Sequence, residues 1–190
     1  MNPAARLMRA QAQNNAWANH RLLNACAALT QAAWEAPRSG FFPSLRATLN
    51  HILIIDHFYV DALEGGMLGP AAFAERMPCR SVAELQAAQT AVDRRLCAFC
   101  DALDDAALDR IIRVHRGQRI QEERCDRLLL HIFQHAIHHR GQAHAMLSQA
   151  GVKPPQLDEV YSRLEAPLRA VECQALGFSE ADLWPEDLGR

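Results

Sequence analysis

The sequence of 190 residues has an ordinary globular composition, with 49% hydrophobic and 22% charged residues. Its length fits a single domain over residues 1–190. A net charge of −2 argues against nucleic-acid binding, because no excess of positive charge is available to neutralise phosphates. The polar start does not resemble a secretory signal, and no apolar run reaches the roughly 18 residues that span a bilayer. We therefore expect a cytoplasmic protein with neither membrane nor nucleic-acid partners.

Two helices are predicted in the first third of the sequence. Residues 3–30 are rich in alanine and follow Asn2, a residue type that caps helices, with proline in the first turn where it is tolerated. A connector containing prolines and a glycine occupies residues 34–43. Ser44 then caps a second helix, over residues 44–63, which ends before a pair of glycines.

Two more long helices are predicted in the rest of the chain, separated by an extended segment. Residues 66–80 contain glycines and prolines, which indicate a long loop. A capping-box sequence opens a third helix over residues 81–103, and β-branched residues within 104–121 favour a small hairpin or extended excursion. A fourth helix is expected over residues 122–150, and the tail from residue 157 is expected to add one or two short helices.

Four long helices predict an all-α fold, a four-helix bundle with a small extended excursion between its third and fourth helices. The long loop before the third helix allows the second and third helices to run parallel. Residues 52–55 of the second helix are apolar around most of its circumference. Because a bundle leaves one side of each helix outward, we expect a homodimer that covers part of this apolar surface.

Histidine is the unusual feature of the composition: the chain has nine, and five of them lie between His131 and His144. In the fourth predicted helix His135 and His139 are four residues apart, so they lie side by side facing the bundle interior. Two imidazoles at this spacing can chelate one metal ion. In the second predicted helix His51 shares a face with mostly apolar residues, which predicts a third buried imidazole.

Other interpretations of these histidines remain open at this point. A single buried histidine is more often a hydrogen-bonded core residue than a ligand, and a histidine-lined core without metal fits the same pattern. Three histidines with an open position are a known catalytic metal arrangement. The sequence lacks the Glu-x-x-His pairs of di-iron bundles and the His-Glu-x-x-His motif of zinc peptidases. Cys97 and Cys100 have no second pair to complete a zinc site, so we expect them to be structural.

The sequence of residues 131–142, HIFQHAIHHRGQ, resembles the signature of the DinB (DNA-damage-inducible) family of DinB/YfiT-like proteins. Three further segments are similar to other parts of that family: WANHRLL at 17–23, TLNHILIID at 48–56, and GVKPPQLD at 151–158. The four segments occur in the family's order and span residues 17–158, most of the chain.

The resemblance implies a four-helix bundle with up-down-down-up topology, often a homodimer. It also implies a divalent metal, nickel or zinc in the family, held by three histidines that correspond to His51, His135 and His139. Some relatives use low-molecular-weight thiols as transferases or isomerases, and many have no known reaction.

An enzyme is the first functional hypothesis, because a metal held by three neutral imidazoles keeps positions open for water or substrate. Such a metal lowers the pKa of bound water towards about 7, or deprotonates a coordinating thiol. The candidate reactions are therefore hydrolysis and transfer of a low-molecular-weight thiol to a small-molecule substrate. The alternative is a non-catalytic metal-binding stress-response protein, in which a closed four-ligand site mainly stabilises the bundle.

Three other residues are candidates for supporting roles. Asp56 and His131 are candidates to orient the ligands, since a ligating histidine usually donates its other N–H to such a group. Arg140 either binds an acidic group of a substrate or pairs with an acid at the helix surface, which is the commoner role of arginine on helices.

Overall fold

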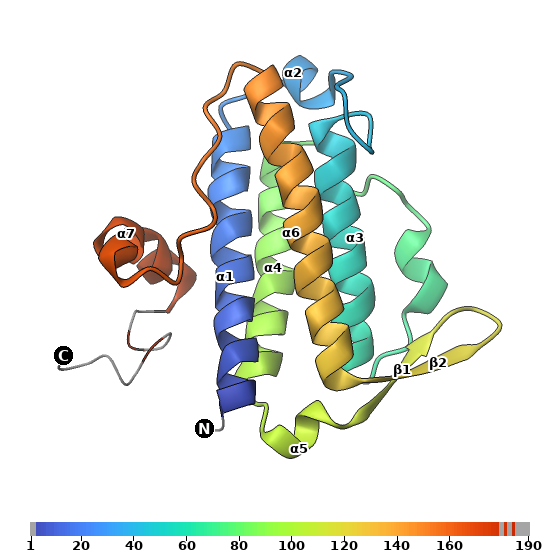
Figure 1. Ribbon diagram of the computed structural model, residues 1–190. Helices are drawn as coiled ribbons and strands as arrows, with labels where there is room; N and C mark the ends of the chain where they lie inside the picture. Colours follow the sequence, from blue (N-terminus) through green and yellow to red (C-terminus); the bar gives the residue numbers. More distant parts are fainter. Residues whose placement is uncertain (1–2, 179–180, 182–183, 185–190) are drawn as a thin grey trace.

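The computed structural model describes residues 3–178, 181 and 184, and it is mostly helical with one small sheet (Figure 1). Its four longest helices lie side by side. They are α1 (Pro3–Cys26), α3 (Leu45–Leu63), α4 (Val82–Asp101) and α6 (Cys125–Gln149). The mostly helical architecture predicted from the sequence is confirmed.

Shorter elements connect and follow these four helices. They are α2 (Gln31–Glu35), the 3-10 helix η1 (Gly69–Phe73), α5 (Asp105–Leu108), strands β1 (Ile111–His115) and β2 (Ile120–Arg124), the 3-10 helix η2 (Arg163–Glu165) and α7 (Ala166–Leu176). The two strands form an antiparallel hairpin in which Val114 pairs with Gln121. Both the extended excursion before the last long helix and the short helices of the tail are confirmed.

A common apolar core lies between the four long helices. Helix α1 packs on α4 and α3 packs on α6, and contacts of α3 with α4 and of α1 with α6 connect these two pairs. One leucine from each helix illustrates the packing, because none is more than 2% exposed: Leu22, Leu53, Leu96 and Leu129. Burial of each such side chain stabilises the fold by about 1.5–3 kcal/mol.

Two helix boundaries differ from the sequence prediction, each for a local reason. The first helix ends at Cys26 instead of continuing to residue 30, because the Thr30 hydroxyl accepts a hydrogen bond from the Ala33 amide and caps the separate helix α2. The last long helix begins at Cys125 instead of residue 122, because residues 122–124 pair with β1. Strand pairing thus overrides the helical propensity of these residues.

The helix caps predicted at Ser44 and Ser81 are confirmed. The Ser44 hydroxyl accepts from the Ala47 amide. Ser81 and Glu84 form a reciprocal capping box at the start of α4. The predicted cap Asn2 lies outside the described residues.

Residues 52–55 are covered within the protein itself, contrary to the argument that predicted a homodimer. Ile52, Leu53 and Ile54 are buried, and Ile55 packs against the core. The apolar surface therefore no longer supports the prediction of a homodimer, which now depends on the family resemblance alone. Within the described part of the chain, no helix combines the length and apolarity needed to cross a membrane.

Candidate metal centre

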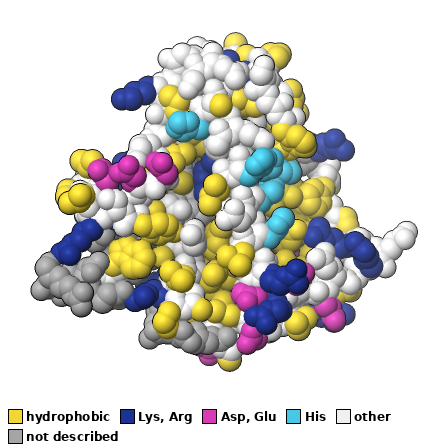
Figure 2. Space-filling model, in the orientation of Figure 1, with side chains coloured by type: hydrophobic (Ala, Val, Ile, Leu, Met, Phe, Trp, Pro, Cys, Tyr) yellow, Lys and Arg dark blue, Asp and Glu magenta, His cyan; other side chains and the backbone are white. Residues whose placement is uncertain are grey.

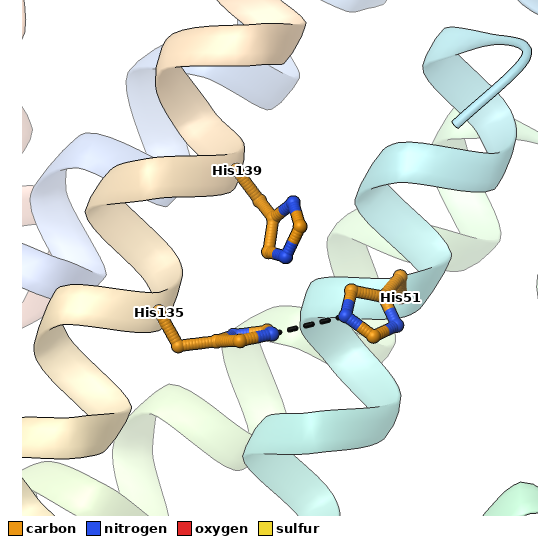
Figure 3. Close-up of side chains that lie close together, drawn as sticks. All are labelled: His51, His135 and His139. Atoms are coloured by element: carbon orange, nitrogen blue, oxygen red, sulfur yellow. Dashed lines mark hydrogen bonds between the residues drawn. The ribbon is translucent and has the colours of Figure 1, made fainter. Parts of the chain in front are cut away.

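Three histidines from two neighbouring helices meet at the edge of the core. His51 lies on α3, and His135 and His139 lie on α6. One ligand atom from each ring lies within 4.8 Å of the corresponding atoms of the other two. Figure 2 shows histidine side chains gathered on the surface over α6 and α3, and Figure 3 shows the three rings turned towards one another. The structure thus brings together the three histidines selected from the sequence.

Helical spacing and helix packing explain this convergence. Residues four apart on α6 lie on the same face, and the ring centroids of His135 and His139 are 4.5 Å apart. Next to these histidines, Ile132 and Ala136 are fully buried on α6, and Ile52 is buried on α3. The packing that buries these apolar side chains holds α3 against α6 and so keeps the imidazoles of the two helices close together.

All three imidazoles are neutral near pH 7, because burial disfavours their charged form. Burial, with a smaller contribution from the neighbouring His139, lowers the pKa of His51 to about 4. Burial, followed by the charges of His139 and His51, lowers the pKa of His135 to about 3. The pKa of His139 is also lowered by burial, although its hydrogen bond to Gln142 acts in the opposite direction. Neutral rings keep the nitrogen lone pairs that metal coordination requires.

The separation of the nitrogens suits a metal ion. Nε2 of His51 and Nε2 of His135 are 3.0 Å apart, so one of them donates a hydrogen bond to the other. At zinc–nitrogen distances of about 2.0–2.1 Å, the nitrogens of a tetrahedral site lie roughly 3.3 Å apart. Nδ1 of His135 is buried and has no hydrogen-bond partner within the described residues. The three side chains therefore fit a divalent cation, which would replace the hydrogen bond between His51 and His135.

Gln142 orients one of the three rings, a role that the sequence analysis missed. Nδ1 of His139 donates to the side-chain oxygen of Gln142 at 2.9 Å, and the Gln142 amide donates to Nε2 of His138 at 3.0 Å. This leaves Nε2 of His139 free, and Figure 3 shows one nitrogen of that ring directed at the other two histidines. The spacing in the sequence could have predicted this contact, because Gln142 follows His139 by three residues on the same helix and such residues lie next to each other.

The two residues predicted to orient the ligands lie elsewhere. The carboxylate of Asp56 accepts a hydrogen bond from Gln89 on α4, at 2.8 Å, and is 1% exposed. No hydrogen bond among the described residues joins it to a histidine of the site. Among the described residues His131 makes ring contacts, at 5.0 Å to Tyr59 and 6.0 Å to His135, and no hydrogen bond. Neither residue holds a ligand by a hydrogen bond.

Arg140 also differs from its predicted surface position. It is 4% exposed, and its guanidinium donates to the side-chain oxygens of Asn15 and Asn19 on α1. These two asparagines donate in turn to Asp93 on α4. Arg140 thus joins a polar network between the long helices, which we call the interior network: Asn15, Asn19, Asp56, Gln89, Asp93 and Arg140.

Aromatic side chains cover one end of the histidine site. The ring of Phe42 lies 4.5 Å from that of His51 and 5.4 Å from that of His139. Phe41 is 77% exposed beside it. The preceding Gly40 lets the loop lie against α6, because a Cβ there would be 2.3 Å from the terminal methyl of Met146. The site therefore has an apolar wall at this end.

Cysteines take no part in the site. The six thiols are free, and all but Cys97 are buried. Burial raises the pKa of Cys97 to about 12 and that of Cys100 well above its usual value, so neither thiol ionises readily. The structural interpretation of this pair is supported.

Comparisons with known proteins confirm the family resemblance found in the sequence. The family model described as the DinB family matches residues 2–169. Protein DinB of Bacillus subtilis (strain 168) is 25% identical over 143 residues, which cover 72% of this chain and 82% of that protein. The crystal structure of a DinB-like protein from Bacillus cereus ATCC 10987 has 16% sequence identity and a TM-score of 0.57, and the match covers 74% of this chain and 90% of that one. The structural match shows a shared fold.

Proposed function

This chain belongs to the DinB family, and we propose that it is a metal-dependent enzyme whose divalent ion, nickel or zinc, is held by His51, His135 and His139. The observation that carries the proposal is the convergence of three neutral imidazoles within 4.8 Å. Among the described residues no acid or cysteine joins this group. Three protein ligands leave positions for a small-molecule substrate, as in catalytic metal sites.

The reaction we propose is either hydrolysis or transfer of a low-molecular-weight thiol to an electrophile. A bound metal ion supplies Lewis acidity, which activates water or a thiol near neutral pH. His51 and His135 bring nitrogen lone pairs from two neighbouring helices, and Gln142 holds the ring of His139 in place. The apolar ring of Phe42 lies against the rings of His51 and His139 and would limit the access of water on that side.

The finer architectural statements belong to the same proposal. We infer that α1, α3, α4 and α6 form an up-down-down-up bundle within a single domain over residues 1–190. The long connection between α3 and α4, which contains η1, supports this order because it gives the chain enough length to return along α3. Homodimer formation and a cytoplasmic location are expectations carried by the family and by the sequence.

A non-catalytic metal-binding stress-response protein is the second candidate. The observation that favours it is that the ligands join two helices, α3 and α6, so a bound ion would hold them together. Under this alternative the ion acquires a fourth protein ligand and has no exchangeable position. Coordination and turnover therefore separate the two candidates.

Elemental analysis of untagged protein, followed by a reaction screen, tests the proposal. We expect about one nickel or zinc ion per chain, and turnover of at least one thiol-addition or hydrolysis substrate that stops when the metal is removed. Turnover that is unchanged in metal-free protein would contradict the proposed chemistry. A stoichiometric metal with four protein ligands and no turnover would favour the second candidate.

A further inference from the structure

Arg116 lies at the turn of the β-hairpin and reaches towards α3. Its Nη2 donates to the hydroxyl of Tyr59 at 2.9 Å, and its Nε donates to the side-chain oxygen of Gln121 at 3.0 Å. The guanidinium carbon also lies 4.8 Å from the centre of the Phe58 ring. Two hydrogen bonds and an aromatic face therefore fix the orientation of this cation.

No carboxylate neutralises Arg116 among the described residues. Other partly buried arginines of the protein pair with acids: Arg21 with Glu172 at 2.6 Å and Arg46 with Glu35 at 2.9 Å. The partners of Arg116 are a phenol and an amide, both uncharged, and its Nη1 has no acceptor within the described residues. A half-buried guanidinium without a counterion is a ready partner for an anion, because charge-assisted hydrogen bonds are stronger than neutral ones.

A series of ring contacts connects this cation to the histidine site. Tyr59, which holds Arg116, has its ring 5.0 Å from that of His131, and His131 lies 6.0 Å from the ring of His135. Burial lowers the pKa of His131, and the charge of Arg116 lowers it further. In Figure 2 basic side chains lie beside the lower end of the group of histidines. Arg116 and the three-histidine site thus share one face, with the apolar wall of Phe42 at the opposite end.

We propose that Arg116 is an anion-binding subsite for a substrate that also reaches the three histidines, so that the substrate class is a molecule with a metal-binding atom at one end and a carboxylate or other anionic group at the other. This inference rests on the proposed metal site. The Nη1 of Arg116 donates to the anion, while Tyr59 and Gln121 keep the guanidinium in place. Arg116 therefore selects among substrates, and the histidines hold the ion.

Binding of thiol probes to cobalt-loaded protein tests the subsite without requiring turnover. The probes are mercaptopropionate, mercaptohexanoate and mercaptoundecanoate, each compared with the mercaptoalcohol of the same chain length. Thiolate binding to cobalt is read from its charge-transfer absorption, which gives a Kd for each probe. For the chain length that matches the separation between the metal and Arg116, we expect the carboxylate probe to bind about tenfold more tightly than its alcohol. A hydrogen bond to a charged group contributes strongly to binding.

Variants of the hairpin supply the controls. Arg116→Gln is expected to remove the preference for the carboxylate while leaving cobalt affinity unchanged, and Arg116→Lys is expected to keep part of it. Arg113→Gln removes an exposed charge from the same hairpin and is expected to keep the full preference. Thermal unfolding of each variant verifies that the hairpin is intact.

Each outcome of the titration either supports or overturns the anion-binding subsite at Arg116. Wild-type protein that binds cobalt but shows no carboxylate preference at any chain length would overturn the subsite and leave the metal site standing. A preference that persists in Arg116→Gln would overturn it as well. Failure of wild-type protein to bind cobalt at all would contradict the three-histidine site, and the subsite with it.

Discussion

The histidine site and the interior network both include a residue of α6, and they differ in what their polar atoms do. His139 and Arg140 are adjacent on α6 and almost equally buried, at 6% and 4% exposed. His139 faces α3 and joins imidazoles whose nitrogens converge on one point. Arg140 faces α1, where Asn15 and Asn19 accept its hydrogen bonds. Burial alone therefore does not mark a functional residue.

The difference lies in how completely the protein satisfies each group. In the interior network the donors and acceptors pair with one another, apart from Oδ1 of Asp56, which is buried without a partner in the described chain. At the histidine site three neutral rings are held together with only one hydrogen bond between them. Neutral rings whose nitrogens converge on one point are suited to bind a ligand. A network whose groups hydrogen-bond mainly to one another serves instead to connect helices.

Removing Arg140 is expected to have the largest effect on stability. Arg140→Met leaves the buried side-chain oxygens of Asn15 and Asn19 without their donor and removes a positive charge that favours ionisation of the buried Asp93. Each buried polar group left without a partner costs about 1–3 kcal/mol. Urea unfolding of metal-free protein measures the loss. Arg94→Met, which removes an exposed arginine from α4, is the matched control and should change stability little. A loss below about 1 kcal/mol in Arg140→Met would show that the interior network is not structural.

The acids of the interior network predict a pH dependence of stability with an unusual sign. Burial raises the pKa of Asp56 to about 8 and that of Asp93 to about 6. Above about pH 4 the unfolded chain releases these protons while the folded chain keeps them. The free energy of unfolding therefore falls as pH rises towards these raised pKa values, by up to about 1.4 kcal/mol per pH unit for each acid.

Asp56→Asn isolates this contribution, because it keeps an acceptor for Gln89 and cannot ionise. Its free energy of unfolding, minus that of wild-type protein, should increase steadily from pH 5 to pH 8 when both are measured without metal. A difference that stays constant over this range would mean that Asp56 does not titrate with a raised pKa.

Gln142 offers the opposite test, on metal affinity and not on stability. Gln142→Leu removes the acceptor that holds Nδ1 of His139, and loss of such a contact weakens metal binding by about 10–100-fold. Competition with a chromophoric chelator measures the affinity. Gln134→Leu, an exposed site on the same helix, is expected to bind metal as wild-type protein does. Equal metal affinities for the two variants would show that Gln142 does not support metal binding by His139.

His144 is expected to give the smallest effect, although it belongs to the same run of histidines. Its Nε2 donates to the carbonyl of Pro155 at 2.9 Å, which ties α6 to the segment that follows it. His144→Ala should lower stability by about 1 kcal/mol and leave metal content unchanged. Loss of metal in this variant would place the site further along α6 than the geometry indicates.

Helical periodicity predicted more of the histidine site than of the interior network. The spacing of His135 and His139 fixes their relative direction on one helix, and His51 stood out among apolar neighbours. The sequence analysis assigned Asp56 to the wrong site, because it lies five positions after His51 and its side chain turns towards α4. Arg140 could not be placed without knowing that Asn15 and Asn19 of α1 face it. The positions of the Asp56 and Arg140 side chains depend on contacts between helices, and helical periodicity does not encode these contacts.

Metal binding by His51→Ala tests the central claim most directly, because His51 is the only one of the three ligands that α3 contributes. Calorimetric titration of wild-type protein with nickel or zinc is expected to show one ion per chain. In His51→Ala the affinity should fall by at least about 100-fold, since two imidazoles from one helix turn remain. Gln134→Ala, which changes an exposed residue on α6, should titrate as wild-type protein does. Full occupancy at unchanged affinity in His51→Ala would contradict a site shared between α3 and α6.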